Sequence, residues 1–199
     1  MKTRTLISSF AALGTGFIMA TTAIAAPTQS VGYGDTSVKL DPIFVGALTS
    51  LKVTPSVFGR AHLRDGVASF PVTDGDFDFG TAKGEFTHAG GLKLTAGTTV
   101  VELGDFIIDT SGAKPMLTGK VIANDNFVAR ITLFDLALPA LTLPLATPPS
   151  GWSTLKIPGV KVTLNAGAAA ALNGVFNVTA FAGGIPIGEA TVKTYTFGH

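Results

Sequence analysis

The chain has 199 residues, of which 46% are hydrophobic, 14 are basic and 13 are acidic, and it contains no cysteine. The lack of cysteine excludes disulfides, thiolate nucleophiles and cysteine-ligated metal, and the near-balanced charge gives no basic surplus for binding nucleic acid. The 24 glycines and 11 prolines exceed the usual ~12% share of these two residues, which favours an all-β domain with many turns.

The first 26 residues have the pattern of an export signal. Lys2 and Arg4 precede an apolar run over residues 6–18, and an A-x-A ending reaches Ala25. The pattern predicts cleavage after Ala25 or the alanine that follows it, and a protein that is secreted, periplasmic or on the cell surface. A retained membrane anchor is the alternative, but Ser, Gly and Thr residues interrupt the ~20 apolar residues that a spanning helix needs. We therefore expect no transmembrane segment in the mature chain.

Residues 27–36 are polar and rich in glycine, and we expect a flexible lead-in there, followed by a single β-rich domain over residues 37–199. Short apolar runs that alternate with polar residues and end at turn residues predict strands in this domain. The expected strands cover residues 67–72, 76–79, 83–88, 92–95, 98–103, 106–108, 116–122, 127–138 and 187–197. The fold class is therefore all-β, a mainly antiparallel β-sandwich or flattened barrel.

Two further segments complete the expected chain of elements. Several prolines follow residue 138, and at most an edge strand at 141–143 is expected among them, because proline cannot sit in a central strand. Residues 151–158 have the composition of a surface loop, with Trp152 as its aromatic anchor.

Residues 38–54 and 162–179 resemble each other and break the β pattern, which predicts an internal strand–helix–strand repeat. Asp41 and Asn165 are good N-cap residues, so we expect short helices over residues 41–50 and 165–173. Pro42 suits the first helical position, and Asn173 with the glycine after it favours a helix end.

The sequence predicts no catalytic residues. No G-x-S-x-G elbow, H-E-x-x-H, phosphate-binding loop or G-x-G-x-x-G occurs, and the chain has only three histidines, at 62, 88 and 199. We therefore expect a protein that is not an enzyme.

Three aspartates could suggest calcium binding. Asp74, Asp76 and Asp78 alternate, and Glu85 follows at the spacing of a calcium-loop ligand. Phe79, however, takes the position that needs glycine, and the alternation is typical of a solvated strand face. We expect no metal site.

His88 is the candidate ligand-binding residue. It shares strand parity with Phe86, which predicts that it faces the apolar side, and it precedes Gly90 and Gly91, where a backbone can approach a ligand closely. Two interpretations stay open: a ligand or supporting group in an apolar pocket, or a buried histidine bonded to backbone.

The segment around His88 resembles a known family. Residues 84–94, GEFTHAGGLKL, are similar to the G-x-v-x-F-t-G-H-d-G-x-L-d-l segment of HtaA-type haem-binding domains, and residues 101–122 continue in a similar style. The resemblance implies an exported, β-rich bacterial module that holds haem through a tyrosine ligand supported by a histidine. Only His88 matches that motif, since Tyr33 and Tyr195 lie in other contexts.

Two functions follow as expectations. The first is an exported, non-catalytic domain that binds a hydrophobic small molecule such as haem near His88. The alternative is a structural or adhesive cell-envelope domain without a small-molecule site. A closed, filled interior favours the second, and an open cavity of roughly 300 Å³ or more favours the first.

Overall fold

The computed structural model describes residues 28–146 and 151–198, so the expected export segment and His199 lie outside the described residues. It contains eleven strands and two helices. The elements are β1 (Thr28–Leu40), α1 (Pro42–Ser50), β2 (Thr54–Phe58), β3 (His62–Arg64), β4 (Val67–Asp78), β5 (Lys83–His88), β6 (Gly91–Ala96), β7 (Thr99–Asp109), β8 (Met116–Ala123), β9 (Asn126–Ala137), β10 (Gly151–Leu164), α2 (Ala166–Phe176) and β11 (Pro186–Gly198). The all-β class with two short capped helices is confirmed.

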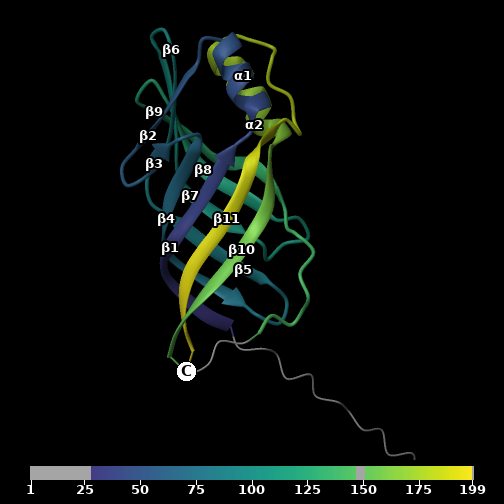
Figure 1. The fold of residues 1–199 in the computed structure, drawn as a ribbon. Helices are drawn as coiled ribbons and strands as arrows, with labels where there is room; N and C mark the ends of the chain where they lie inside the picture. Colours follow the sequence, from purple (N-terminus) through teal and green to yellow (C-terminus); the bar gives the residue numbers. More distant parts are fainter. Residues whose placement is uncertain (1–27, 147–150, 199) are drawn as a thin grey trace, which may run out of the picture.

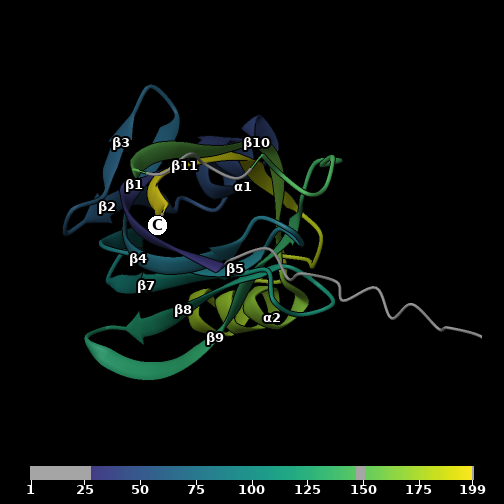
Figure 2. The same cartoon turned by 90° about the horizontal axis from the view of Figure 1, so that it is seen from below.

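The sheet closes on itself as a flattened barrel. Strands β7, β5, β4, β1, β11, β10, β9 and β8 pair in that order, and β8 returns to pair with β7. In Figure 2, β1, β11 and β10 lie on one side of the interior, and β5, β7 and β8 lie on the other. Strands β2, β3 and β6 stand outside this circuit, since β6 pairs with β7, β2 with β6, and β3 with β4. All of these pairings are antiparallel.

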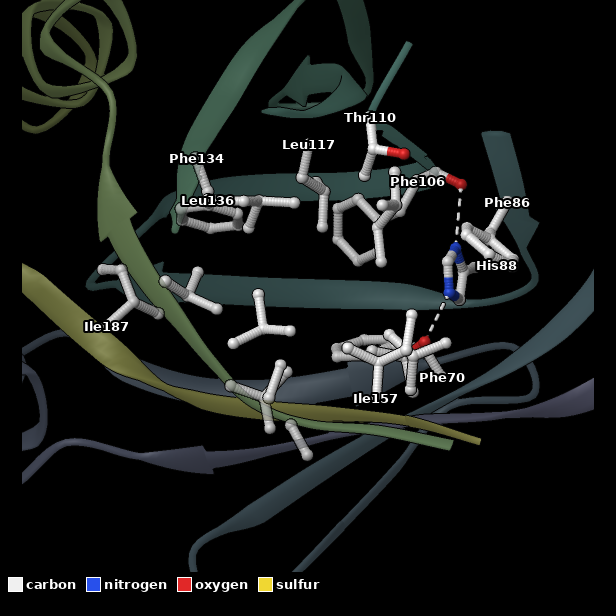
Figure 3. Close-up of a pocket in the computed structure, with 18 of the residues that line it drawn as sticks. Phe70, Phe86, His88, Phe106, Thr110, Leu117, Phe134, Leu136, Ile157 and Ile187 are labelled. Carbon is white, nitrogen blue, oxygen red and sulfur yellow. Dashed lines mark hydrogen bonds between the residues drawn. The ribbon is translucent and has the colours of Figure 1, made fainter. Parts of the chain in front are cut away.

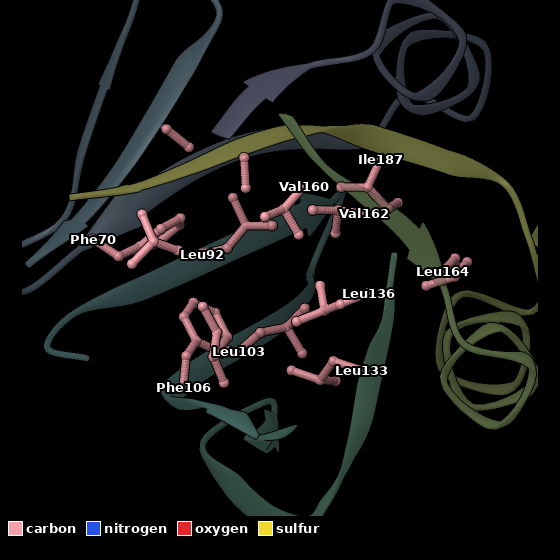
Figure 4. Packing of buried hydrophobic residues seen from close by; sticks show 14 of the residues in the cluster. Phe70, Leu92, Leu103, Phe106, Leu133, Leu136, Val160, Val162, Leu164 and Ile187 are labelled. Atoms are coloured by element: carbon pink, nitrogen blue, oxygen red, sulfur yellow. The ribbon is translucent and has the colours of Figure 1, made fainter. Parts of the chain in front are cut away.

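The hydrophobic core fills the space inside the barrel. Inward residues alternate along the strands, as in β4, where Phe77 is fully buried between the exposed Asp76 and the half-buried Asp78. Figure 4 shows leucines, valines and phenylalanines from opposite walls packed against one another. With no cysteine in the chain, this apolar burial is the main source of stability.

Both helices lie at the same end of the barrel (Figure 1), with α1 against β11 and α2 against β9. Each has the N-cap that the sequence predicts: Asp41 accepts a hydrogen bond from the Ile43 backbone N–H at 2.8 Å, and Asn165 accepts one from Gly167 at 2.9 Å. The apolar face of α1 buries Phe44 and Leu48. Within residues 28–146 and 151–198, no helix has the length and apolar character to cross a bilayer.

The Asn165 cap also joins α2 to the barrel, because its side-chain amide donates to Asp135 Oδ1 at 2.9 Å. Asn165→Ala removes both interactions, and we expect the free energy of unfolding to fall by about 1 kcal/mol. Urea denaturation measures this loss. Asn165→Asp keeps the cap but places a carboxylate beside Asp135, so we expect it to recover only part of the lost stability. Equal stability of Asn165→Ala and the wild type would contradict the role of Asn165 as a stabilising cap.

Three predictions about loops and strands are wrong. Residues 28–36, expected as a lead-in, belong to β1, which has strand partners on both edges, β4 and β11. Residues 151–158, expected as a loop, are part of β10, because Pro158 falls at a β-bulge where no ladder hydrogen bond is needed. Residues 141–143 form no strand, and the N–H of the nearby Leu145 donates to the Phe79 carbonyl oxygen at 2.8 Å.

The end of α2 also differs from the prediction. The helix continues past residue 173 to Phe176 and ends at Asn177, which takes the left-handed conformation. The Asn173 side chain instead bonds both backbone groups of Phe181, at 2.8 and 3.0 Å. Val178 and Thr179 follow α2 as irregular chain and not as the expected second strand, and the Val178 N–H donates to the Asn173 carbonyl oxygen at 3.0 Å.

Candidate functional site

An apolar cavity runs through the interior of the barrel, with a volume of about 70 Å³. Its walls come from β1, β4, β5, β6, β7, β8, β9, β10 and β11, and Phe44 of α1 lines it from the helical end. Figure 3 shows Phe106, Leu117 and Leu136 on one wall and Ile157 on the facing wall. A second cavity of about 40 Å³ lies beside α2 and shares Phe44 with the first. The interior is therefore narrow and lined almost wholly by hydrocarbon.

His88 supplies the polar end of the larger cavity. Its Nε2 atom lies 2.7 Å from the Thr36 hydroxyl, and its Nδ1 atom lies 3.3 Å from the Phe106 carbonyl oxygen, as the dashed lines in Figure 3 mark. A carbonyl oxygen only accepts hydrogen bonds, so the proton of the neutral ring sits on Nδ1. Nε2 then accepts the Thr36 O–H. Both ring nitrogens are thus engaged by the protein itself.

Burial keeps His88 uncharged. Loss of solvation lowers the pKa of His88 from its ordinary 6.5 to about 4, although the Phe106 carbonyl, the charge of Asp35 and the Phe86 backbone act in the opposite direction. At neutral pH the ring is a neutral hydrogen-bonding group that connects β5 to β1 and β7. The sequence prediction that His88 faces the apolar side is correct.

Gly90 and Gly91, which follow His88, do not line a cavity that a ligand could occupy. A Cβ atom on Gly91 would lie 2.4 Å from the Phe58 ring, and one on Gly104 would lie 2.8 Å from it. The Phe58 ring therefore occupies the space that the glycines leave open. Gly90 has a φ of +81°, which only glycine adopts readily, and its Cβ would meet the Ala61 backbone.

The aspartates Asp76 and Asp78 of β4 are engaged in hydrogen bonds to neighbouring groups. The described residues contain no group of three His, Cys, Asp or Glu side chains that could hold a metal. Asp76 accepts a hydrogen bond from Ser30, and Asp78 accepts from Gly80 and Thr81, which lowers the Asp78 pKa. The solvated strand face predicted for these aspartates is confirmed.

Thr36 is the site residue that the sequence did not indicate. It lies in the segment expected to be a lead-in, and only the pairing of β1 with β4, and of β4 with β5, brings it within hydrogen-bond distance of His88. A threonine at an inward strand position carries no signal of its own, because threonine is common in strands.

No protein-family model matches the chain, and no curated protein sequence matches it. Solved structures do show the same fold. The C-terminal domain of HtaA from Corynebacterium glutamicum is 14% identical and covers 85% of this chain and 99% of its own, with a TM-score of 0.61. The N-terminal domain of the same protein is also 14% identical, over 85% and 99%, with a TM-score of 0.53. The heme-binding protein HtaB from this organism is 10% identical, over 85% and 96%, with a TM-score of 0.50. The resemblance to HtaA-type domains is confirmed for the fold.

Proposed function

We propose that this chain is an exported, non-catalytic binding domain with an HtaA-like fold, which encloses a slender apolar molecule, such as a short alkyl chain, beside His88. The observation that carries the proposal is the continuous apolar cavity between the two walls of the barrel. Export rests on the N-terminal sequence pattern.

The chemistry of the cavity favours an apolar occupant over water. A cavity of 70 Å³ has room for about five water-sized groups at ~10–15 Å³ each. A water needs two to four polar partners. The polar side chains that line the cavity are Thr36, His88 and Thr110, and each already bonds to a group of the protein. An apolar ligand would restore the dispersion contacts that an empty cavity loses.

Haem does not fit this interior. Ligands of that size occupy roughly 300–1,000 Å³, several times the volume present here. The tyrosines Tyr33 and Tyr195 are exposed on the outside of the barrel and do not line the cavity. The hydroxyl group that bonds to His88 belongs to Thr36, and His88 Nε2 would have to give up that bond in order to coordinate iron. His88 is therefore proposed as the polar end of an apolar site, and no haem ligand is assigned.

The small volume also favours a second candidate, a structural envelope domain whose interior is simply packed. The two functions differ in one measurable property, which is whether the cavity takes up an added apolar molecule.

The experiment compares Ala190→Ile, which fills the cavity, with Ala137→Ile, which adds the same atoms on the outer face of β9. Benzene and n-hexanol are added to each protein, and the melting temperature and the methyl NMR shifts of cavity residues are recorded. We expect both probes to stabilise the wild type and Ala137→Ile by about 1–3 °C at low millimolar concentration, and to leave Ala190→Ile unchanged, since ligands that bind only the folded state raise its stability.

Equal shifts in all three proteins, or no shift in any, would favour the structural alternative. Haemin titration followed in the Soret region tests the family's ligand directly. We expect no saturable band; a saturable band that disappears in His88→Ala would overturn the proposal in favour of haem binding.

A further inference from the structure

Four exposed aromatic side chains gather on the outer face of β1, β11 and β10, which lie side by side in Figure 1. Tyr33 and Tyr195 are directly opposite each other on β1 and β11, and Trp152 and Phe197 are opposite each other on β10 and β11. The exposed fractions are 69% for Tyr33, 66% for Trp152 and 42% for Tyr195 and Phe197. The rings of Trp152 and Phe197 meet edge to face at 5.3 Å. We call these four residues the aromatic patch.

Two lysines adjoin the aromatic patch on the same face. Lys156 and Lys193 are directly opposite each other on β10 and β11. Lys193 lies two residues before Tyr195 on β11 and therefore on the same outer face. Like charges in that arrangement repel each other. Among the described residues neither lysine has a carboxylate within ion-pair distance, although Asp35 is the register partner of Lys193 on β1. The pair is therefore complementary to an anionic surface.

Starting from the strand ends, the aromatic residues and the lysines follow one another in the order in which these residue types occur across a bilayer interface. Trp152 and Phe197 lie next to the strand ends Gly151 and Gly198, the tyrosines follow, and the lysines are farthest from that end. Tryptophan and tyrosine favour the boundary between lipid tails and headgroups, and lysines extend towards phosphate groups.

We infer that the aromatic patch and its two lysines dock this domain on an anionic lipid bilayer, with the strand ends at the surface and the helices pointing away. A lipid surface is favoured over a second copy of the chain because two copies would bring two lysine pairs together. The inference is independent of the interior cavity, since the outward residues of these strands take no part in lining it.

The test uses Trp152, the one tryptophan in the chain, as the probe. The protein is purified in the form that an exporting bacterial host produces and is mixed with vesicles of phosphatidylcholine alone or with 30% phosphatidylglycerol. Some vesicles carry lipids brominated at shallow positions of the acyl chain. We expect a blue shift and strong quenching of Trp152 fluorescence with the anionic vesicles, because a ring at the interface lies within reach of the bromines.

Two double variants and one control separate the contributions of the tyrosines and of the lysines to vesicle binding. Tyr33→Ser with Tyr195→Ser should weaken binding at least tenfold while keeping the Trp152 reporter. Lys156→Gln with Lys193→Gln should weaken binding to the anionic vesicles roughly thirtyfold, about fivefold for each lysine. Phe127→Ser removes an equally exposed ring, 64% exposed on β9, and should leave binding unchanged.

Three other outcomes would overturn the inference. Binding without quenching of Trp152 would show that another part of the chain, such as the N-terminal segment, meets the bilayer. A blue shift that depends on protein concentration without vesicles would identify a second copy as the occupant. Equal losses in the Phe127 control and the patch variants would also contradict it.

Discussion

At pH 4 the free energy of unfolding is expected to be about 3 kcal/mol lower than at pH 7 because of His88 alone. The pKa of this buried histidine is about 4 in the folded protein, against an ordinary value of 6.5. Between these two values the unfolded chain binds a proton that the folded protein does not. The stabilisation from an uncharged His88 is therefore complete above pH 6.5 and is lost as the pH falls towards 4.

Urea denaturation at half-unit steps from pH 4 to pH 7.5 measures this slope. His88→Gln keeps a donor and an acceptor but does not titrate, so its stability should be nearly constant over the same window. The lowered pKa values of Asp78 and Asp109 add a further loss of stability at still lower pH, which cancels in the comparison between variants. A slope that persists in His88→Gln would contradict the assignment.

Gly84→Ala is expected to destabilise the protein by about 3 kcal/mol or to prevent folding, although it adds only one methyl group. A Cβ atom on Gly84 would lie 2.2 Å from the Asp76 carbonyl oxygen and 3.0 Å from the Phe77 Cα atom, so the backbone of β4 would have to move. Phe77 is fully buried opposite Gly84 and packs against Phe79 and Phe86. The displacement would therefore spread into the core.

Gly32→Ala is the matched control, because a Cβ atom there meets nothing within 4 Å. Thermal unfolding of the two variants should show a large fall in melting temperature for Gly84→Ala and a change of a few degrees at most for Gly32→Ala. Similar melting temperatures would mean that the β4–β5 contact is more compliant than the structure indicates.

Local features of the fold were predictable from the sequence. The caps Asp41 and Asn165 depend on neighbouring residues only. The inward position of His88 follows from strand parity. Each of these signals lies within a few residues of the feature that it predicts.

The features that the sequence did not show depend on distant partners. β1 looks unstructured because its segment is polar and rich in glycine, yet pairing on both edges makes it a central strand. The turn-like Pro158 and Gly159 fall inside β10 as a bulge, which only the pairing with β11 reveals. The contact between Thr36 and His88 spans 52 positions, so no local pattern could indicate it.

The pairing of β1 with β11 also sets the order in which the chain can fold. The register joins Val31 to Thr196 and Leu40 to Gly188, so the circuit cannot close before β11 has been synthesised. Such remote pairing gives a high contact order, for which folding times of milliseconds to seconds are typical. During that interval the polypeptide remains unfolded, which is the state that the proposed export would require of it.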